Sequence, residues 1–268
     1  MLRSANHPIA RRWRGEVTSP EHWGIDTSVA AQPGEAGGFR VRSDSGISGY
    51  LKPTRLCDPE NPRAANEKIV ADLAWEVDVA VAPVILFRRD PCPEDQESRA
   101  CISLVVWPET WVLDQLPTTL AGPADALIRG AVARSCGIIA LDTWVGNVDR
   151  SNPRNATIGI DNDNQAGAGF AYIDHSYSLN FGGQWDNEAK RSNVAVPAMP
   201  DVLRRAVDRA ILEEAIGRVE RVTDSIIEEL VGRIPPDYME ASHRHHVVTG
   251  LKDRRPLIRP ILATTFGL

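Results

Sequence analysis

The stretch Asp142-Thr-Trp-Val-Gly-Asn-Val-Asp-Arg-Ser-Asn-Pro-Arg-Asn155 places acidic and amide side chains directly behind the apolar run 136–141. The apolar run predicts a helix, and the polar stretch marks where that helix ends. A second aspartate, Asp174, follows the short apolar segment 171–173. Such a concentration of carboxylates and amides indicates a site of chemistry.

The segment between these two stretches predicts a β-hairpin. Residues 156–160 and 169–173 are short strand candidates, and the turn-rich residues 161–168 separate them. A hairpin would fold Asp174 back beside Asp149 and Asn155. Together these side chains could hold a divalent metal against phosphate oxygens while one carboxylate orients a nucleophile, which is the division of labour that phosphoryl transfer requires.

Composition narrows the class of protein. The chain has 268 residues, of which 43% are hydrophobic, so it is long enough for one large domain or for two lobes with a sizeable core. Its net charge of −6 gives no global positive field that would favour nucleic acid or an anionic membrane. We therefore expect neither as a partner.

The cysteines and the hydropathy pattern point to the cytoplasm. The four cysteines have no Cys-x-x-Cys spacing and fit neither a zinc site nor a disulfide framework, so we expect reduced thiols: Cys57, Cys92, Cys101 and Cys136. Arg11-Arg-Trp-Arg14 resembles a twin-arginine signal, but a polar stretch follows it where an apolar one is required. No segment reaches the roughly 18 consecutive apolar residues of a membrane span.

The sequence predicts mainly β-structure in the N-terminal part of the chain. Residues 1–36 show little periodicity, whereas Phe39–Arg42 and Tyr50–Lys52 are alternating runs that flank a turn-rich segment and predict a hairpin. Residues 61–77 then predict a helix, one face of which carries Val70, Leu73, Ala74 and Val77. Residues 79–87 and 101–107 predict two more strands.

The back of the chain predicts helices. Residues 124–141 indicate one long helix, residues 201–234 one or two amphipathic helices, and residues 243–249 part of a last helix.

Glu67 lies on the apolar face of the predicted helix 61–77. A charged residue on an inward face needs a partner, and Lys52 on the preceding strand is the nearest candidate in chain order. Alternatively, the helix macrodipole favours Glu67 near the start of the helix, and Lys52 is a solvated strand residue. The two residues by themselves favour this plainer arrangement.

The order of Lys52, Glu67, Asp149 and Asp174 resembles that of the protein-kinase superfamily. The motif sequences resemble most those of the small HipA-like kinases. These kinases carry a strand of the type Tyr-Val-Val-Lys, which corresponds here to Tyr50-Leu-Lys52. Their Ala-Asn-Glu helix is matched by Ala65-Asn-Glu67.

Two further motifs, between residues 142 and 175, make the resemblance specific. A catalytic stretch of the type Asp-x-Trp-x-x-Asn-x-Asp-Arg is matched at every named position from Asp142 to Arg150. The Ile-Asp-His signature, the family's counterpart of the metal-binding Asp-Phe-Gly, is matched by Ile173-Asp-His175. The resemblance covers roughly residues 38–182.

The resemblance implies a role for each matched residue. Lys52 would hold the α- and β-phosphates of ATP, and Glu67 would fix its ammonium group. Asp149 would accept or orient the proton of the acceptor hydroxyl. Asp174 would bind Mg²⁺, and an asparagine after Asp149 would supply the second metal contact.

The asparagine and the glycine loop depart from the usual kinase pattern. The asparagine expected five residues after Asp149 falls on Arg154, which Asn152 and Asn155 flank; we choose Asn155 because it adjoins the next strand. No Gly-x-Gly-x-x-Gly is present. Of two glycine-containing segments, 46–49 indicates a hairpin turn, while Gly34-Glu-Ala-Gly37-Gly38 either covers the phosphates or is a linker. The resemblance also places the nucleotide against Val105 and Trp107.

Other polar residues receive plainer interpretations. Asp142, Trp144 and Asn147 could be catalytic, but helix capping and packing beneath the catalytic loop explain them as well, and we prefer these structural roles. His175 is interpreted as fixing the loop around Asp174 through hydrogen bonds to the backbone. The segment Asp161-Asn-Asp-Asn-Gln165 starts like a calcium loop but lacks the required glycine and glutamate. His243-Arg-His-His246 has no pair of histidines at the i, i+4 spacing of a helical metal site, so a solvated surface is expected.

The resemblance implies a bilobal protein-kinase-like fold of the α+β type, with a small β-rich N-lobe and a mainly helical C-lobe. We expect an irregular segment at 1–36, an N-lobe with the Glu67 helix at 37–108, and a C-lobe at 109–268. The implied activity is ATP- and magnesium-dependent transfer of the γ-phosphoryl group to a hydroxyl, on a protein serine or threonine or on a small molecule.

The alternatives are a pseudokinase-like module that binds nucleotide or a partner without turnover, and a purely structural interaction domain. The implied family leaves open a toxin role, with an antitoxin or another operon product as a partner.

Overall fold

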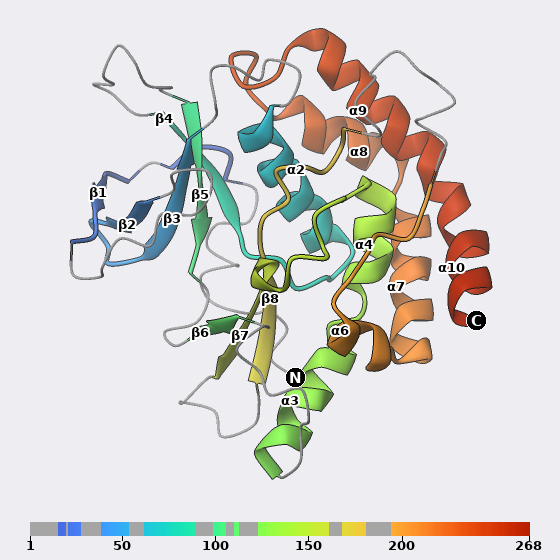
Figure 1. The fold of residues 1–268 in the computed structure, drawn as a ribbon. Helices are drawn as coiled ribbons and strands as arrows, with labels where there is room; N and C mark the ends of the chain where they lie inside the picture. The colour runs from blue at the N-terminus through green and yellow to red at the C-terminus, as the bar shows by residue number, and fades with distance from the viewer. Residues whose placement is uncertain are drawn as a thin grey trace.

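A five-stranded antiparallel sheet forms the first part of the computed structural model, which describes residues 16–19, 21–27, 39–53, 62–88, 99–105, 110–112, 123–160, 168–180 and 194–268. Its strand order is β1-β2-β3-β5-β4 (Figure 1). The strands are β1 (Trp23–Ile25), β2 (Phe39–Ser43), β3 (Ser48–Pro53), β4 (Val84–Arg88) and β5 (Arg99–Leu104). Trp23, Leu51, Ile85 and Ile102 belong to a small hydrophobic cluster on this sheet.

The predicted hairpin between β2 and β3 is confirmed, with Phe39 opposite Leu51. Its turn is closed by a bond from the backbone N–H of Ser43 to the carbonyl of Ile47, and Gly46 supplies a φ of 85°. The hairpin turn therefore includes Gly46, as expected, whereas Ser48 and Gly49 of the segment 46–49 already belong to β3. Gly49 must lack a side chain, because a Cβ there would lie 2.4 Å from Cγ2 of Ile102 on β5.

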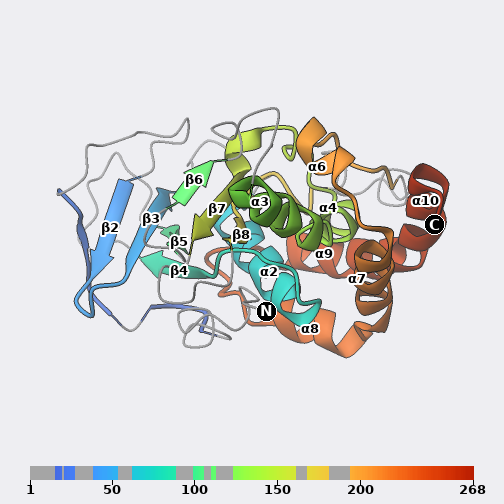
Figure 2. The same ribbon diagram turned by 90° about the horizontal axis from the view of Figure 1, so that it is seen from below.

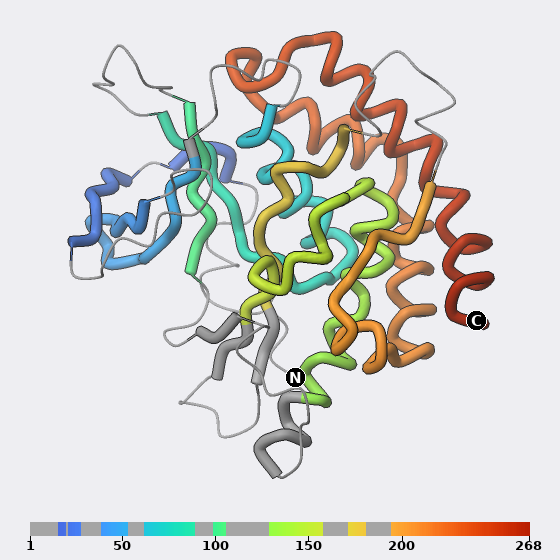
Figure 3. The backbone as a smooth tube through the Cα atoms, viewed as in Figure 1, coloured from blue at the N-terminus to red at the C-terminus, as the bar shows by residue number. Residues whose placement is uncertain are grey.

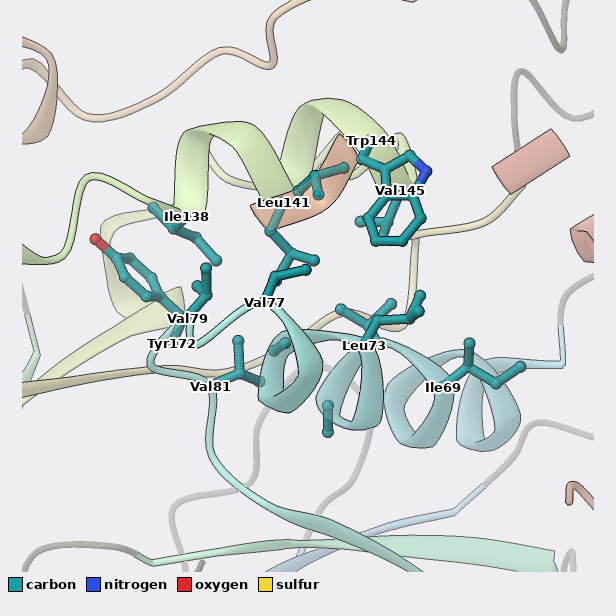
Figure 4. Packing of buried hydrophobic residues seen from close by; sticks show 14 of the residues in the cluster. Ile69, Leu73, Val77, Val79, Val81, Ile138, Leu141, Trp144, Val145 and Tyr172 are labelled. Carbon is teal, nitrogen blue, oxygen red and sulfur yellow. The ribbon is translucent and has the colours of Figure 1, made fainter. Parts of the chain in front are cut away.

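Helix α2 (Arg63–Glu76) lies between the sheet and the helical part of the molecule. It is buried on more than the single face that the sequence predicted, since Ala65, Asn66, Glu67 and Lys68 are buried along with its apolar residues. Figure 4 shows its Ile69, Leu73 and Val77 facing Leu141 and Trp144 of the next layer. This sandwiched position holds Glu67 between the two parts of the molecule.

The rest of the chain is mainly helical and lies beside the sheet (Figure 2). Its helices are α3 (Pro123–Arg134), α4 (Ile138–Val145), α6 (Asp201–Arg205), α7 (Arg209–Arg221), α8 (Asp224–Gly232), α9 (Ala241–Arg254) and α10 (Ile258–Phe266). A second antiparallel sheet has the order β6-β7-β8, formed by β6 (Thr110–Val112), β7 (Ala156–Ile160) and β8 (Ala168–Tyr172). The fold class is thus α+β, with a β-rich N-lobe and a mostly helical C-lobe, as expected.

Several expected elements differ in the structure. The helix predicted over 124–141 is broken at 135–137, where the Ser135 hydroxyl pairs with the hydroxyl of Tyr172 at 2.8 Å. The strand predicted over 79–87 begins only at Val84, because residues 80–82 bond instead to Tyr172 of the second sheet.

The structure also contains more helices and strands than the sequence predicted. Residues 201–234 form three helices instead of one or two. β1 lies in the segment 1–36 for which no regular structure was expected, and β6 and α10 were not anticipated. None of the helices within the described ranges is both long and apolar enough to cross a membrane.

Candidate active site

Lys52 and Glu67 form an ion pair across the space between β3 and α2. The Nζ atom of Lys52 lies 2.6 Å from Oε1 of Glu67, whose side chain is 2% exposed. The same Nζ atom lies 3.3 Å from Oδ1 of Asp174. Of the two arrangements that the sequence left open, the structure therefore shows the paired one, and it adds Asp174 as a second carboxylate.

Lys52 stabilises the ionised forms of both carboxylates, although Asp174 raises the pKa of Glu67. Burial alone would lower the pKa of Lys52, but the carboxylates of Glu67 and Asp174 raise it, so the ammonium group stays protonated. Burial raises the pKa of Glu67, and Lys52 opposes that rise. Burial likewise disfavours ionised Asp174, but Lys52 and a hydrogen bond from Ser176 lower its pKa below the usual value. The cluster therefore presents a cation beside an ionised aspartate.

Asp149 and Asn155 lie together in the loop after α4. The amide Nδ2 of Asn155 donates to Oδ2 of Asp149 at 2.8 Å and to the carbonyl of Asp149 at 3.1 Å. A short 3₁₀ helix, Pro153–Asn155, takes up the extra residue that the spacing required. Asn152 instead caps this turn by accepting the N–H of Arg154 at 3.1 Å, and it is exposed. The structure thus brings Asn155, rather than Asn152, beside Asp149.

The hairpin of β7 and β8 carries Asp174 to the same place. Ala156 is paired with Tyr172, and the N–H of Ile173 donates to the carbonyl of Asn155 at 3.0 Å. The predicted hairpin is confirmed. Asp174 itself has a φ of 61°, in the left-handed region that a residue other than glycine enters at a cost, and such conformations concentrate at functional sites.

Arg150 forms the buried centre of the loop, although it is next to Asp149 in sequence. Its guanidinium contacts Asp142 through Nε at 2.6 Å and through Nη2 at 3.3 Å. It also donates to the carbonyl of Asn155 at 2.6 Å and to that of Ile173 at 3.4 Å. Arg150 thereby ties the segment that carries Asp149 to the segment that carries Asp174. The sequence flagged Arg150 only as part of a motif.

His175 completes this buried cluster as a neutral ring. Its Nε2 atom lies 3.3 Å from Nη2 of Arg150, which can only donate, so Nε2 accepts and the proton is on Nδ1. Burial and the charge of Arg150 lower the pKa of His175 well below its usual value. The backbone of His175 also helps to lower the pKa of the Glu67 carboxylate. His175 therefore fixes the loop around Asp174, as the sequence suggested.

The other residues that the sequence singled out have structural contacts. Asp142 accepts from Nδ2 of Asn147 at 3.0 Å, and Oδ1 of Asn147 accepts the N–H of Asp149 at 3.0 Å. The indole Nε1 of Trp144 donates to the carbonyl of Leu251 at 2.8 Å. These contacts cap and pack the helix end beneath the loop.

The expected nucleotide contacts are described only in part. Val105 directly follows β5, is half-buried, and donates its N–H to the carbonyl of Ser48 at 2.9 Å. Gly37, Gly38 and Trp107 lie outside the described residues. Gly37 and Gly38 fall in the connection between β1 and β2 in chain order.

The oxygen donors present suit Mg²⁺ bound together with phosphates. Within the described residues, no group of three or more His, Cys, Asp or Glu side chains could hold a metal alone. Mg²⁺ commonly uses one or two carboxylates and completes its shell with substrate phosphates and water. Asp174, whose carboxylate is 33% exposed, and the amide oxygen of Asn155 fit that requirement.

Comparison with solved structures identifies the fold as protein-kinase-like. The proinflammatory kinase CtkA of Helicobacter pylori matches with a TM-score of 0.66 and 13% identity, over 90% of this chain and 95% of that one. The Golgi casein kinase with Mn and ADP bound matches with a TM-score of 0.50 and 10% identity, over 97% of this chain and 76% of that one. No family model and no curated protein sequence matches the chain.

Proposed function

We propose that the chain is a kinase of the HipA-like type that uses ATP and Mg²⁺ to phosphorylate a hydroxyl group. The observation that carries this proposal is the meeting of two groups of side chains. Lys52 contacts Glu67 and Asp174, while Asp149 contacts Asn155, and the Asn155–Ile173 backbone bond joins the groups. Phosphoryl transfer depends mainly on such positioning and on charge stabilisation.

Each residue has a definite task in the proposed reaction. Lys52 binds the α- and β-phosphates, and Glu67 holds its ammonium group in place. Asp149 orients the acceptor hydroxyl and receives its proton as the oxygen attacks the γ-phosphorus. The bond between that phosphorus and the β-γ bridging oxygen breaks, and ADP leaves. Asp174 and Asn155 would hold Mg²⁺, which neutralises charge on the phosphates.

A module that binds nucleotide without turnover is the second candidate. It is favoured by the absence of a Gly-x-Gly-x-x-Gly motif and by the displaced asparagine at position 155. The acceptor of the proposed kinase is a protein serine or threonine or a small molecule, and a toxin role would bring an antitoxin partner.

The first experiment incubates the protein with γ-labelled ATP and Mg²⁺ and follows both label transfer and ATP loss. We expect Asp149→Asn to lower turnover by about 100-fold or more while nucleotide still binds, because a positioned acid or base contributes about that much. Asp174→Asn should lose the magnesium dependence of nucleotide binding. Asp201→Asn is the matched control, since its side chain is 78% exposed at the start of α6.

The outcomes separate the candidate functions. Turnover that both site variants abolish, and that the Asp201 variant keeps, supports the kinase. Tight nucleotide binding with no turnover would favour the binding module. Absence of any magnesium-dependent nucleotide binding would reject both and leave a structural interaction domain.

A further inference from the structure

Two groups contact the same oxygen, Oδ1, of the Asp174 carboxylate. The hydroxyl Oγ of Ser176 donates to Oδ1 at 2.9 Å, and Nζ of Lys52 approaches the same oxygen at 3.3 Å. Asp174 also has a left-handed backbone, a conformation that a residue other than glycine keeps only where its surroundings hold it. Restraint at Oδ1 fixes the direction of the whole carboxyl group.

Ser176 is itself fixed by helix α2. The amide Nδ2 of Asn66 donates to the carbonyl of Ser176 at 3.3 Å, and Asn66 is fully buried beside Glu67. The next residue, Tyr177, lies with its ring 4.6 Å from the guanidinium carbon of Arg63, also on α2. Figure 3 shows the segment after β8 running alongside α2. Helix α2 therefore holds both the partner of Lys52 and the backbone of Ser176.

We propose that Ser176 is a positioning residue that orients Asp174 for metal binding. By donating to Oδ1, its hydroxyl would fix the direction of the carboxylate that would hold the cation. Partners that hydrogen-bond to a metal-binding carboxylate orient it, and their loss commonly weakens metal affinity by about 10–100-fold. The inference rests on the proposed function, and it adds to it a residue for which the sequence gave no role.

The test compares Ser176→Ala with Ser176→Thr, which keeps the hydroxyl. Ser178→Ala is the matched control, because it makes the same change two residues away. Ser178 is also buried, and its hydroxyl has no hydrogen-bond partner within the part of the chain that the structure describes. Binding of Mn²⁺ in the presence of ADP is measured by electron paramagnetic resonance, which reads the free ion directly. Metal-free ADP affinity and thermal unfolding are measured beside it.

We expect Ser176→Ala to weaken Mn²⁺ binding by about tenfold or more, with ADP affinity in the absence of metal unchanged. Ser176→Thr should restore most of the affinity, and Ser178→Ala should match the wild type. Wild-type Mn²⁺ affinity in Ser176→Ala would overturn the inference and leave the kinase proposal standing. Failure of the wild-type protein to bind Mn²⁺ with ADP would overturn both.

Discussion

Arg150 and Asp142 form an ion pair with almost no access to water. Their side chains are 2% and 1% exposed, and the Nε to Oδ2 distance is 2.6 Å. Removal of one partner from a buried pair leaves the other charge uncompensated, whereas removal of both does not. The pair therefore positions the loop, while its net contribution to the free energy of unfolding, relative to two uncharged residues, is small.

We expect Arg150→Met and Asp142→Asn each to lower the free energy of unfolding by about 3–5 kcal/mol. The double variant should lose less than the sum of the two, because neither charge is then left alone. Urea unfolding followed by circular dichroism measures all three. Arg205→Met and Asp201→Asn, which break an exposed pair on α6, are the controls and should change little. Additive losses in the Arg150 and Asp142 variants would contradict this account.

The residues of the candidate site were predictable where short motifs carry them. Lys52, Glu67, Asp149 and Asp174 each sit within a recognisable stretch of sequence. The structure pairs Lys52 with Glu67 and Asp174, and it pairs Asp149 with Asn155. The contacts of Arg150 were not predictable, because its partners come from a helix, a loop and a strand end, up to 25 residues away in the chain.

At the scale of single elements, Gly146 ends helix α4 and starts the loop that carries Asp149. It has φ 66° and ψ 41°, in the left-handed region, and its N–H donates to the carbonyl of Asp142. Glycine is favoured at such a helix end because it has no Cβ to crowd the following carbonyl.

We expect Gly146→Ala to lower the free energy of unfolding by about 1 kcal/mol. Gly232→Ala is the matched control, because Gly232 is the last residue of α8 and a Cβ there meets nothing within 4 Å. That control should be neutral or slightly stabilising. Equal losses in the two variants, measured by thermal and urea unfolding, would show that the backbone at Gly146 is not decisive.

The elements that the sequence misplaced are those set by distant contacts. The break at 135–137 interrupts an apolar pattern that is continuous in sequence, and the bond between Ser135 and Tyr172 spans 37 residues. The late start of β4 has a similar cause, since the N–H of Ala82 donates to the carbonyl of Tyr172. The hairpins at β2–β3 and β7–β8 were predictable because their signals are local.

At the scale of the whole molecule, the segment between α8 and α9 contacts the far ends of β4 and β5. The hydroxyl of Tyr238 donates to the carbonyl of Phe87 at 2.8 Å, and the guanidinium of Arg99 donates to the carbonyl of Asp237. Arg244 of α9 donates to the carbonyl of Val231 in α8 and to the carbonyl of Ile234 in this segment. These hydrogen bonds attach the helical part of the molecule to the first sheet.

Tyr238→Phe removes only the hydroxyl and should lower the free energy of unfolding by about 1 kcal/mol, the net value of one hydrogen bond. Burial raises the pKa of Tyr238 to about 12, from 10.0. Between these two pH values the unfolded chain has lost the proton and the folded chain has kept it, so wild-type stability falls as pH rises. The stability advantage over the Phe variant should therefore shrink above pH 10, which urea unfolding at pH 8 and pH 11 would measure. An advantage independent of pH would contradict the burial of the hydroxyl.

The end of helix α4 has a consequence for the synthesis of the protein. Arg254 donates to the carbonyls of Thr143 and Trp144, and it lies 110 residues after Trp144. At roughly 5–20 residues per second, a ribosome needs several seconds to supply that arginine after the loop sequence has been made. For that interval the nascent chain contains α4 and the loop that follows it, but it lacks the arginine that binds the carbonyls at the end of α4.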